Sequence, residues 1–330
     1  MTLNSKTLIV CGPTSVGKTT LALKLASKFN GELISADSRQ VYKGMDILTG
    51  KDIPTGFNKV DSLLTFEDKK INYYSNGKIR IWLYDIVNPD EQFNISLWKN
   101  LAEIVITDIH FRRKLPIIVG GSGLYLRSIS ENIETISIPP NPELRKSLQT
   151  KSIAQLQDIL RGISRERMIT MNSSDLNNPR RLIRAIEVSN QKPNLEYLNN
   201  KLRRGFLKIG LTAPKEELEK RIHERVRQRI TLGAGKEAAK LLRSGLDLNL
   251  PAMTATGIME WRSYLQSPKA SQAESPMHLL TNRWEKSEKS YLRRQITWFK
   301  KDPNINWFDT TQESWEENAE NLIRNWYNGN

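Results

Sequence analysis

The stretch Gly12-Pro13-Thr14-Ser15-Val16-Gly17-Lys18-Thr19 decides the fold, because it matches the phosphate-binding loop G-x-x-x-x-G-K-[ST] without interruption. Residues 7–11 before it are apolar and rich in β-branched side chains, which is typical of a strand buried on both faces. Leu21, Leu25 and Phe29 follow at helical spacing, so we predict a helix that begins near Lys18. Backbone N–H groups of the loop and the positive end of the helix favour phosphate. The sequence therefore predicts a diphosphate site in which Lys18 reaches a terminal phosphate and the Thr19 hydroxyl holds Mg²⁺.

Composition limits the class of protein and its partners. The chain has 330 residues and a formal net charge of +14, which suggests a polyanionic partner, with nucleic acid the leading candidate. The alternative is a protein that is merely basic. A single cysteine and three histidines exclude an internal disulfide framework and argue against a zinc site. The first residues lead directly into the first strand without a secretion signal, and no apolar run is long enough to cross a bilayer, so we expect a cytoplasmic protein with no membrane partner.

Alternating strand and helix patterns predict an α/β fold, with a P-loop NTPase-like parallel sheet flanked by helices. Further strands are predicted at residues 32–35, 79–86, 116–119 and 206–211, and helices at residues 96–112, 216–230 and 282–301. Residues 50–78 are weakly patterned, and we expect an excursion with a small hairpin around residues 70–78. Parallel sheets place ligands at the carboxyl ends of their strands. Asp37, which follows the second strand, is therefore expected to project into the same crevice as the phosphate loop, and residues 120–125 form a second glycine-rich turn at a strand end.

The character of the chain changes after Arg127. Residues 139–200 contain several prolines, short helical patterns and a basic segment at residues 178–187, which indicates an all-helical lobe inserted into the core. We therefore predict that residues 1–130 form the first part of the P-loop core and residues 131–202 a helical insertion. Residues 203–330 then supply the last core strand and C-terminal helices, with Trp307, Trp315 and Trp326 in a packed tail.

Four segments together resemble the tRNA dimethylallyltransferase family. They are residues 37–42, 120–125, 179–184 and 294–298, and the resemblance runs from about residue 8 to about residue 308. Members of this family transfer a dimethylallyl group from dimethylallyl diphosphate to N6 of adenine 37, beside the tRNA anticodon. The resemblance implies tRNA and dimethylallyl diphosphate as partners, and we expect the protein to act as a monomer.

The resemblance also implies roles for individual residues. The lone pair of adenine N6 is delocalised into the ring, so a carboxylate that accepts its proton is expected to help. Asp37 is the candidate, although it could instead cap the next helix or bind Mg²⁺ through water. Ser122 stands where the family usually has threonine, and its hydroxyl would donate to the bridging oxygen of the diphosphate. Arg225 matches a family arginine that reaches the diphosphate, with Arg221 as the alternative.

Residues that meet the flipped adenine or the anticodon stem are also implied by the resemblance. Gln40 would offer both a donor and an acceptor to the base. For residues 293–301 the alternative is a solvated basic helix, and for Trp298 we favour a place in the core. The implied tRNA contacts are Asp37, Ser38, Arg39, Gln40, Ser122, Arg145, Arg180, Arg181, Arg184, Arg293, Arg294, Gln295, Trp298 and Lys300.

Some segments depart from the family pattern. They are residues 51–54, residues 82–85, the region after Glu187, and residues 253–258, which lack the usual arginine and tyrosine. The resemblance therefore implies that the diphosphate chemistry is intact and that the surface expected to read tRNA has drifted. Three other functions therefore remain as hypotheses: a P-loop kinase of nucleosides or small metabolites, a prenyltransferase acting on free mononucleotides, and a non-catalytic RNA-binding descendant.

Overall fold

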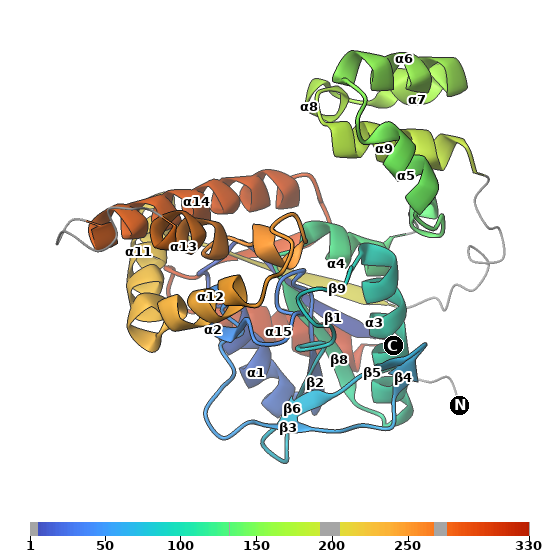
Figure 1. Ribbon diagram of the computed structural model, residues 1–330. Helices are drawn as coiled ribbons and strands as arrows, with labels where there is room; N and C mark the ends of the chain where they lie inside the picture. The colour runs from blue at the N-terminus through green and yellow to red at the C-terminus, as the bar shows by residue number, and fades with distance from the viewer. Residues whose placement is uncertain (1–5, 132, 192–204, 267–275, 330) are drawn as a thin grey trace. The chain divides into compact units, whose positions relative to one another are not determined.

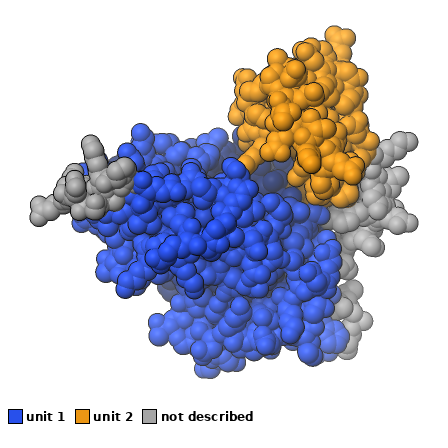
Figure 2. All heavy atoms as spheres, in the orientation of Figure 1, with its two compact units in different colours: residues 1–130, 203–330 blue, residues 131–202 orange. Residues whose placement is uncertain are grey.

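The computed structural model describes residues 6–131, 133–191, 205–266 and 276–329 (Figure 1). The chain forms two compact units (Figure 2): one contains residues 1–130 and 203–330, and the other contains residues 131–202. No helix within the described ranges is both long and apolar enough to span a bilayer.

An eight-stranded sheet in the order β10-β9-β1-β8-β2-β7-β6-β3 forms the centre of the first unit. Pairing is parallel from β10 to β7 and antiparallel from β7 through β6 to β3. The strands are β1 (Thr7–Cys11), β2 (Gly31–Ser35), β3 (Asn58–Val60), β6 (Tyr73–Ser75), β7 (Arg80–Trp82), β8 (Leu115–Gly120), β9 (Phe206–Thr212) and β10 (Ile305–Asp309). Every residue of β1, β2 and β8 is buried, as expected for parallel strands covered on both faces. The predicted mainly parallel α/β fold is confirmed.

Helices surround this sheet, and a separate two-stranded ribbon pairs β4 (Thr65–Phe66) with β5 (Lys69–Lys70) (Figure 1). The helices of the first unit are α1 (Lys18–Lys28), α2 (Asp46–Thr49), α3 (Ile95–Phe111), α4 (Gly123–Ser130), α11 (Lys215–Leu232), α12 (Ala234–Arg243), α13 (Ile258–Leu265), α14 (Pro276–Phe299) and α15 (Trp315–Asn328), with a 3₁₀ turn, η2 (Ala252–Thr254). The apolar residues of α1 that recur at helical spacing, Leu21 and Leu25, are fully buried.

Two predictions in the first unit differ from the structure, and one strand was not predicted. The strand expected at residues 79–86 ends at Trp82, because Leu83 and Asp85 adopt positive φ of 67° and 55° and interrupt the ladder. A hairpin was expected around residues 70–78. The observed hairpin lies slightly later in the chain, because β6 pairs antiparallel with β7. The parallel edge strand β10 was not predicted, because only one of its five residues is fully buried and its sequence lacks a clear alternating pattern.

The second unit has its own helices and core. It contains η1 (Glu134–Ile136), α5 (Pro142–Leu148), α6 (Ile153–Ile163), α7 (Arg165–Thr170), α8 (Ser173–Leu176) and α9 (Pro179–Ser189). Leu156, Leu160 and Leu182 are fully buried between them. The side chain of Glu187 is also fully buried. Burial alone would raise the pKa of Glu187, but hydrogen bonds from Arg145, the Asn141 backbone and Arg184 lower it to about 2.

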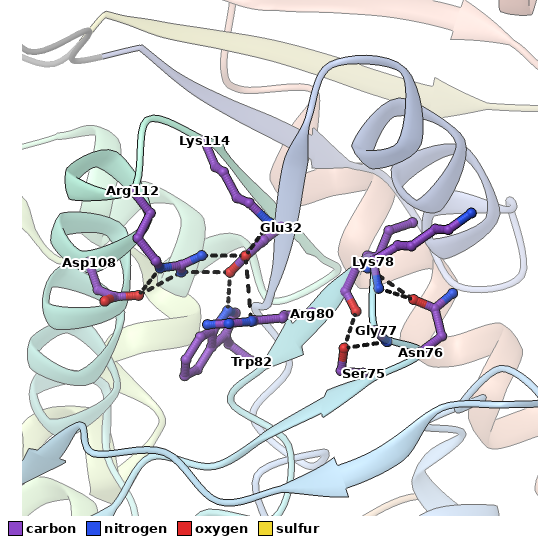
Figure 3. A network of polar contacts seen from close by, with 11 residues as sticks. Glu32, Ser75, Asn76, Gly77, Lys78, Arg80, Trp82, Asp108, Arg112 and Lys114 are labelled. Atoms are coloured by element: carbon purple, nitrogen blue, oxygen red, sulfur yellow. Dashed lines mark hydrogen bonds and ion pairs between the residues drawn. The ribbon is translucent and has the colours of Figure 1, made fainter.

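A buried carboxylate joins strands and helix at the amino ends of β2 and β7 (Figure 3). The side chain of Glu32 has no exposed surface, and its carboxylate accepts hydrogen bonds from Arg112 at 2.8 Å and Trp82 Nε1 at 2.9 Å. Lys114 Nζ donates to it at 3.0 Å, and Arg80 lies 3.7 Å away. Burial would raise the pKa of Glu32, but these partners lower it below its ordinary value.

We expect Glu32→Gln to lower the free energy of unfolding by about 3 kcal/mol at neutral pH, because it leaves the partners of a buried charge uncompensated. Since the folded pKa is depressed, this contribution is complete above pH 4.5, the ordinary carboxyl value, and is lost as pH falls through the lower folded pKa. Urea denaturation followed by tryptophan fluorescence between pH 3 and 7 measures it. The control is Glu316→Gln, which breaks an exposed pair with Lys24 and should cost under about 1 kcal/mol. Equal losses in both variants would contradict the assignment.

Candidate active site

Backbone pairing brings three loops to one edge of the sheet. Strand β8 lies between β1 and β2, with Val119 opposite Val10 in one pair and opposite Ser35 in the other. The segments that leave the carboxyl ends of these strands are therefore neighbours: the phosphate loop, residues 120–122 and residues 36–40. Together with residues 48–54 and parts of α11, η2 and α14 they line a cavity of about 660 Å³.

The phosphate loop has the backbone geometry that its glycines permit. Gly12 has φ of 133°, and a Cβ there would collide with the carbonyl oxygen of Leu211, so only glycine fits. Gly17 precedes α1 with φ of 93°. Ser15 has φ of 62°, and its buried hydroxyl has no hydrogen-bond partner among the described residues. A buried, unsatisfied donor in an anion-binding turn points to a ligand oxygen.

The ammonium group of Lys18 lies across the loop. Its Nζ donates to the Pro13 carbonyl at 2.5 Å. Burial lowers the pKa of Lys18 to about 8, and the nearby charge of Arg225 lowers it further, while Asp37 opposes the shift. Asp37 and Lys18 line the same cavity, as predicted from their places after the carboxyl ends of parallel strands. An anion bound here would offset the repulsion between the two cations.

Helix α11 supplies two arginines to the cavity, Arg225 and Arg229. Arg225 donates to the Thr14 hydroxyl at 3.2 Å and to the Gly50 carbonyl at 3.3 Å, and it pairs with Asp52. Arg221, the alternative from the sequence, instead bonds Glu217 and Thr310 and is not among the residues that line the cavity. The structure therefore places Arg225 at the phosphate loop.

Arg229 was not identified from the sequence as a residue of the site, although its i+4 spacing from Arg225 placed it on the same helix face. It is 6% exposed and pairs with the buried Glu288 at 3.3 Å. Burial lowers the pKa of Arg229 to about 10, and the Arg225 charge contributes. Both guanidinium groups lie against Gly50, whose φ is 61°, so a side chain at this position would displace them.

The backbone N–H groups of Ser38 and Arg39, which are adjacent in the chain, donate hydrogen bonds to Ser122 and Asp37. One carboxylate oxygen of Asp37 accepts a hydrogen bond from the Arg39 N–H at 2.8 Å, so this residue closes a local turn while it lines the cavity. The Ser122 hydroxyl accepts from the Ser38 N–H at 3.2 Å. Burial raises the pKa of Tyr291, and a hydrogen bond with Ser122 partly offsets this.

Gln40 and Arg39 are engaged within the protein. The Gln40 amide oxygen accepts from the Ser35 hydroxyl at 2.9 Å, and its nitrogen donates to the Gly50 carbonyl at 2.8 Å. The side chain that the resemblance assigned to a flipped base therefore holds the Gly50 turn. Arg39 donates to the Pro251 carbonyl and to the Thr254 hydroxyl, and so joins this segment to η2.

The tRNA contacts predicted near the end of helix α14 fall into a buried group and an exposed group. The buried face carries Leu280, Trp284, Glu288, Leu292, Gln295 and Phe299. Gln295 is 5% exposed and therefore faces the core rather than solvent. Arg293, Arg294 and Lys300 are exposed.

The core position that we favoured for Trp298 is wrong. The Trp298 side chain is 41% exposed, because it lies outside the run of buried positions spaced three and four residues apart on α14. Its ring packs against Gly123, where a Cβ would collide with it.

Three of the four arginines of the second unit that were predicted to contact tRNA form ion pairs within the protein. Arg145 and Arg184 pair with the buried Glu187, and Arg181 pairs with Asp175. Arg180 is exposed on α9. Sequence patterning placed these cations on helices but could not show which ones neutralise an internal carboxylate.

A glycine-rich loop between a buried parallel strand and a helix, with a lysine and arginines around it, defines an α/β protein of the P-loop class. A family model described as IPP transferase matches residues 68–302. The chain is 35% identical over 316 residues to the tRNA dimethylallyltransferase of Halothermothrix orenii, covering 93% of this chain and 88% of the relative. It is 34% identical to that of Acetivibrio thermocellus, covering 96% and 95%. The protein belongs to the IPP transferase family, whose curated members here are prenyltransferases.

Solved structures agree with this assignment. The full-length tRNA isopentenylpyrophosphate transferase of Bacillus halodurans superposes with a TM-score of 0.64 at 30% identity, covering 98% of this chain and 97% of that one. A eukaryotic dimethylallyltransferase acting on tRNA has a TM-score of 0.74 at 22% identity, covering 97% and 79%, which shows a shared fold.

Since the pKa of Lys18 is lowered to about 8, we expect its charge, and with it the affinity for inorganic diphosphate, to fall as pH rises above 8. The apparent Kd should increase up to about tenfold per pH unit, the limit for linkage to one proton. Calorimetry between pH 6.5 and 10 measures this. Lys18→Arg keeps its charge over this range, so only the titrations of diphosphate itself and of Arg229, whose pKa is about 10, should remain. Identical pH profiles for the two proteins would contradict the assignment.

Proposed function

We propose that this protein transfers the dimethylallyl group of dimethylallyl diphosphate to N6 of adenine 37 in tRNA. One observation carries the proposal: the carboxylate of Asp37 lines the same cavity as the phosphate loop and its cations. Prenyl transfer to an amine needs both a cradle for the leaving diphosphate and a proton acceptor beside the nucleophile. The names of the 34–35% identical relatives support the same reaction.

In the proposed reaction the bond between the allylic carbon and the diphosphate oxygen breaks as N6 attacks that carbon. Lys18 and Arg225 stabilise the charge that develops on the leaving diphosphate. Asp37 accepts the N6 proton, so the products are the prenylated adenosine and diphosphate. The Asp37 oxygen that accepts from the Arg39 N–H fixes the orientation of the carboxylate. Ser122, one hydrogen bond from Ser38, lies beside this base.

Magnesium fits the donor set of the site. No cluster of three or more histidine, cysteine or acidic side chains suited to a metal occurs within the described ranges. The Thr19 hydroxyl of the phosphate loop would be the ligand from the protein, and diphosphate oxygens would complete the shell. Both Thr19 and Asp37 line the cavity. When bound, Mg²⁺ would neutralise part of the diphosphate charge.

The exposed cations of α14 supply a surface for the RNA backbone. Arg293, Arg294 and Lys300 lie near the end of the helix whose buried face reaches the phosphate loop. Arg294 also stacks over the ring of Tyr291, with 5.7 Å from its guanidinium carbon to the ring centroid. Exposed arginine and lysine side chains on one helix suit contacts with phosphate groups.

The deciding experiment incubates the protein with isotopically labelled dimethylallyl diphosphate, Mg²⁺ and an anticodon stem-loop RNA. We expect prenylated adenosine in the RNA digest by mass spectrometry, and no transfer to free AMP. Label on AMP instead would favour the mononucleotide prenyltransferase. ATP turnover without prenylation would favour a kinase, and diphosphate binding without any product would favour the non-catalytic descendant.

Asp37→Asn separates the role of base from that of a turn cap. The amide oxygen keeps the acceptor for the Arg39 N–H, but an amide cannot take a proton at neutral pH. We expect kcat to fall on the order of 100-fold or more. The Kd for stem-loop RNA should stay within about twofold of the parent value, a change in binding free energy well below the ~1.4 kcal/mol of a tenfold step. Single-turnover kinetics and filter binding measure the two quantities. Full activity in this variant would mean that Asp37 only closes the turn.

A further inference from the structure

Gln295 connects two turns that lie far apart in the sequence. Its amide oxygen accepts a hydrogen bond from the Thr14 N–H in the phosphate loop at 2.8 Å. Its amide nitrogen donates to the carbonyl of Gly121, in the second glycine-rich turn, at 3.0 Å. The side chain is 5% exposed, so both bonds are made away from water, where losing them is most costly.

Thr14 is held from two sides. The backbone N–H of Thr14 donates to Gln295, while the Thr14 hydroxyl accepts from Arg225 at 3.2 Å. The Thr14 N–H is thus bonded to protein, and this fixes the direction in which the rest of the loop can present its N–H groups to phosphate. Without Gln295, the N–H would lack a partner and the loop would lose one anchor.

The second turn is shaped to receive the same amide. A Cβ on Gly121 would collide with Gln295 Nε2, so the absence of a side chain allows the close approach. The same turn also contacts the segment that carries the proposed base. The Ser122 N–H donates to the Ala36 carbonyl at 3.3 Å, and the Ser38 N–H donates to the Ser122 hydroxyl at 3.2 Å.

We propose that Gln295 is a positioning residue that sets the phosphate loop against the turn beside Asp37, and that it is not an RNA contact. Only an amide of this length supplies an acceptor for the Thr14 N–H and a donor for the Gly121 carbonyl at once. The side chain thereby fixes the spacing between the cradle for the diphosphate and the base. This proposal rests on the proposed function in that the loop takes the diphosphate of the donor.

The test compares Gln295→Ala, Gly121→Ala and the double variant in the full-length protein, with inorganic diphosphate as the probe. We expect Gln295→Ala to raise the Kd for diphosphate about tenfold, as for the loss of one to two buried hydrogen bonds. Gly121→Ala should also weaken binding, because the added methyl displaces the amide. The double variant should be no weaker than Gln295→Ala alone, because the methyl then meets no side chain.

Two further measurements separate positioning from general damage. Hydrogen exchange should accelerate in peptides that cover residues 12–19 and 120–123 and stay unchanged in β9 and α3. Affinity for stem-loop RNA should stay at the parent value. Thr297→Ala, which removes a hydroxyl that donates to the Arg293 carbonyl within α14, is the matched control and should leave diphosphate binding unchanged.

Parent-like diphosphate affinity in folded Gln295→Ala, or a selective loss of RNA affinity, would overturn the proposal. If Gln295→Ala does not fold, Gly121→Ala carries the test through the same contact. If the parent protein itself binds no diphosphate, the proposed function has failed, whereas exchange in residues 12–19 still decides whether Gln295 positions the loop.

Discussion

The parallel pairing of β8 between β1 and β2 is the constraint on which the site depends. Parallel strands point their carboxyl ends to one edge, and the register of Val119 with Val10 and Ser35 fixes how the loops that follow are aligned. The phosphate loop, the turn at Gly121 and the segment at Asp37 are distant in sequence but become neighbours through backbone hydrogen bonds alone. Because these strands are packed on both faces, a slip of one residue would move every side chain to the opposite packed face, so the register is strongly specified.

Charge is concentrated at this edge. Lys18, Arg225 and Arg229 share one cavity, whose lining also includes the acidic residues Asp37, Asp52 and Glu288. Mutual repulsion and burial lower the pKa of Lys18 and of Arg229, so the protein holds cations at a cost in stability. A bound polyanion would recover part of that cost, which explains why a cavity this basic suits a diphosphate better than a neutral ligand.

Many polar side chains that the resemblance assigns to substrate contacts make contacts within the protein itself. Gln40 holds the Gly50 turn, Gln295 joins two turns, and Arg145 and Arg184 neutralise a buried glutamate. Arg180 and Arg293 are exposed, so they are cations that the proposed function assigns to RNA phosphates.

The sequence by itself determined the phosphate loop, the parallel α/β core and the resemblance to the family, because these follow from local chemistry: glycines for positive φ, buried β-branched strands, and an intact lysine and threonine. Only the tertiary structure decided which side chains face the cavity. The burial of Gln295, the exposure of Trp298, the choice of Arg225 over Arg221 and the entry of Arg229 depend on helix rotation and on partners hundreds of residues away. The edge strand β10 likewise acquires its identity from β9 rather than from its own pattern. Periodicity gives the face of a helix, but packing decides what that face meets.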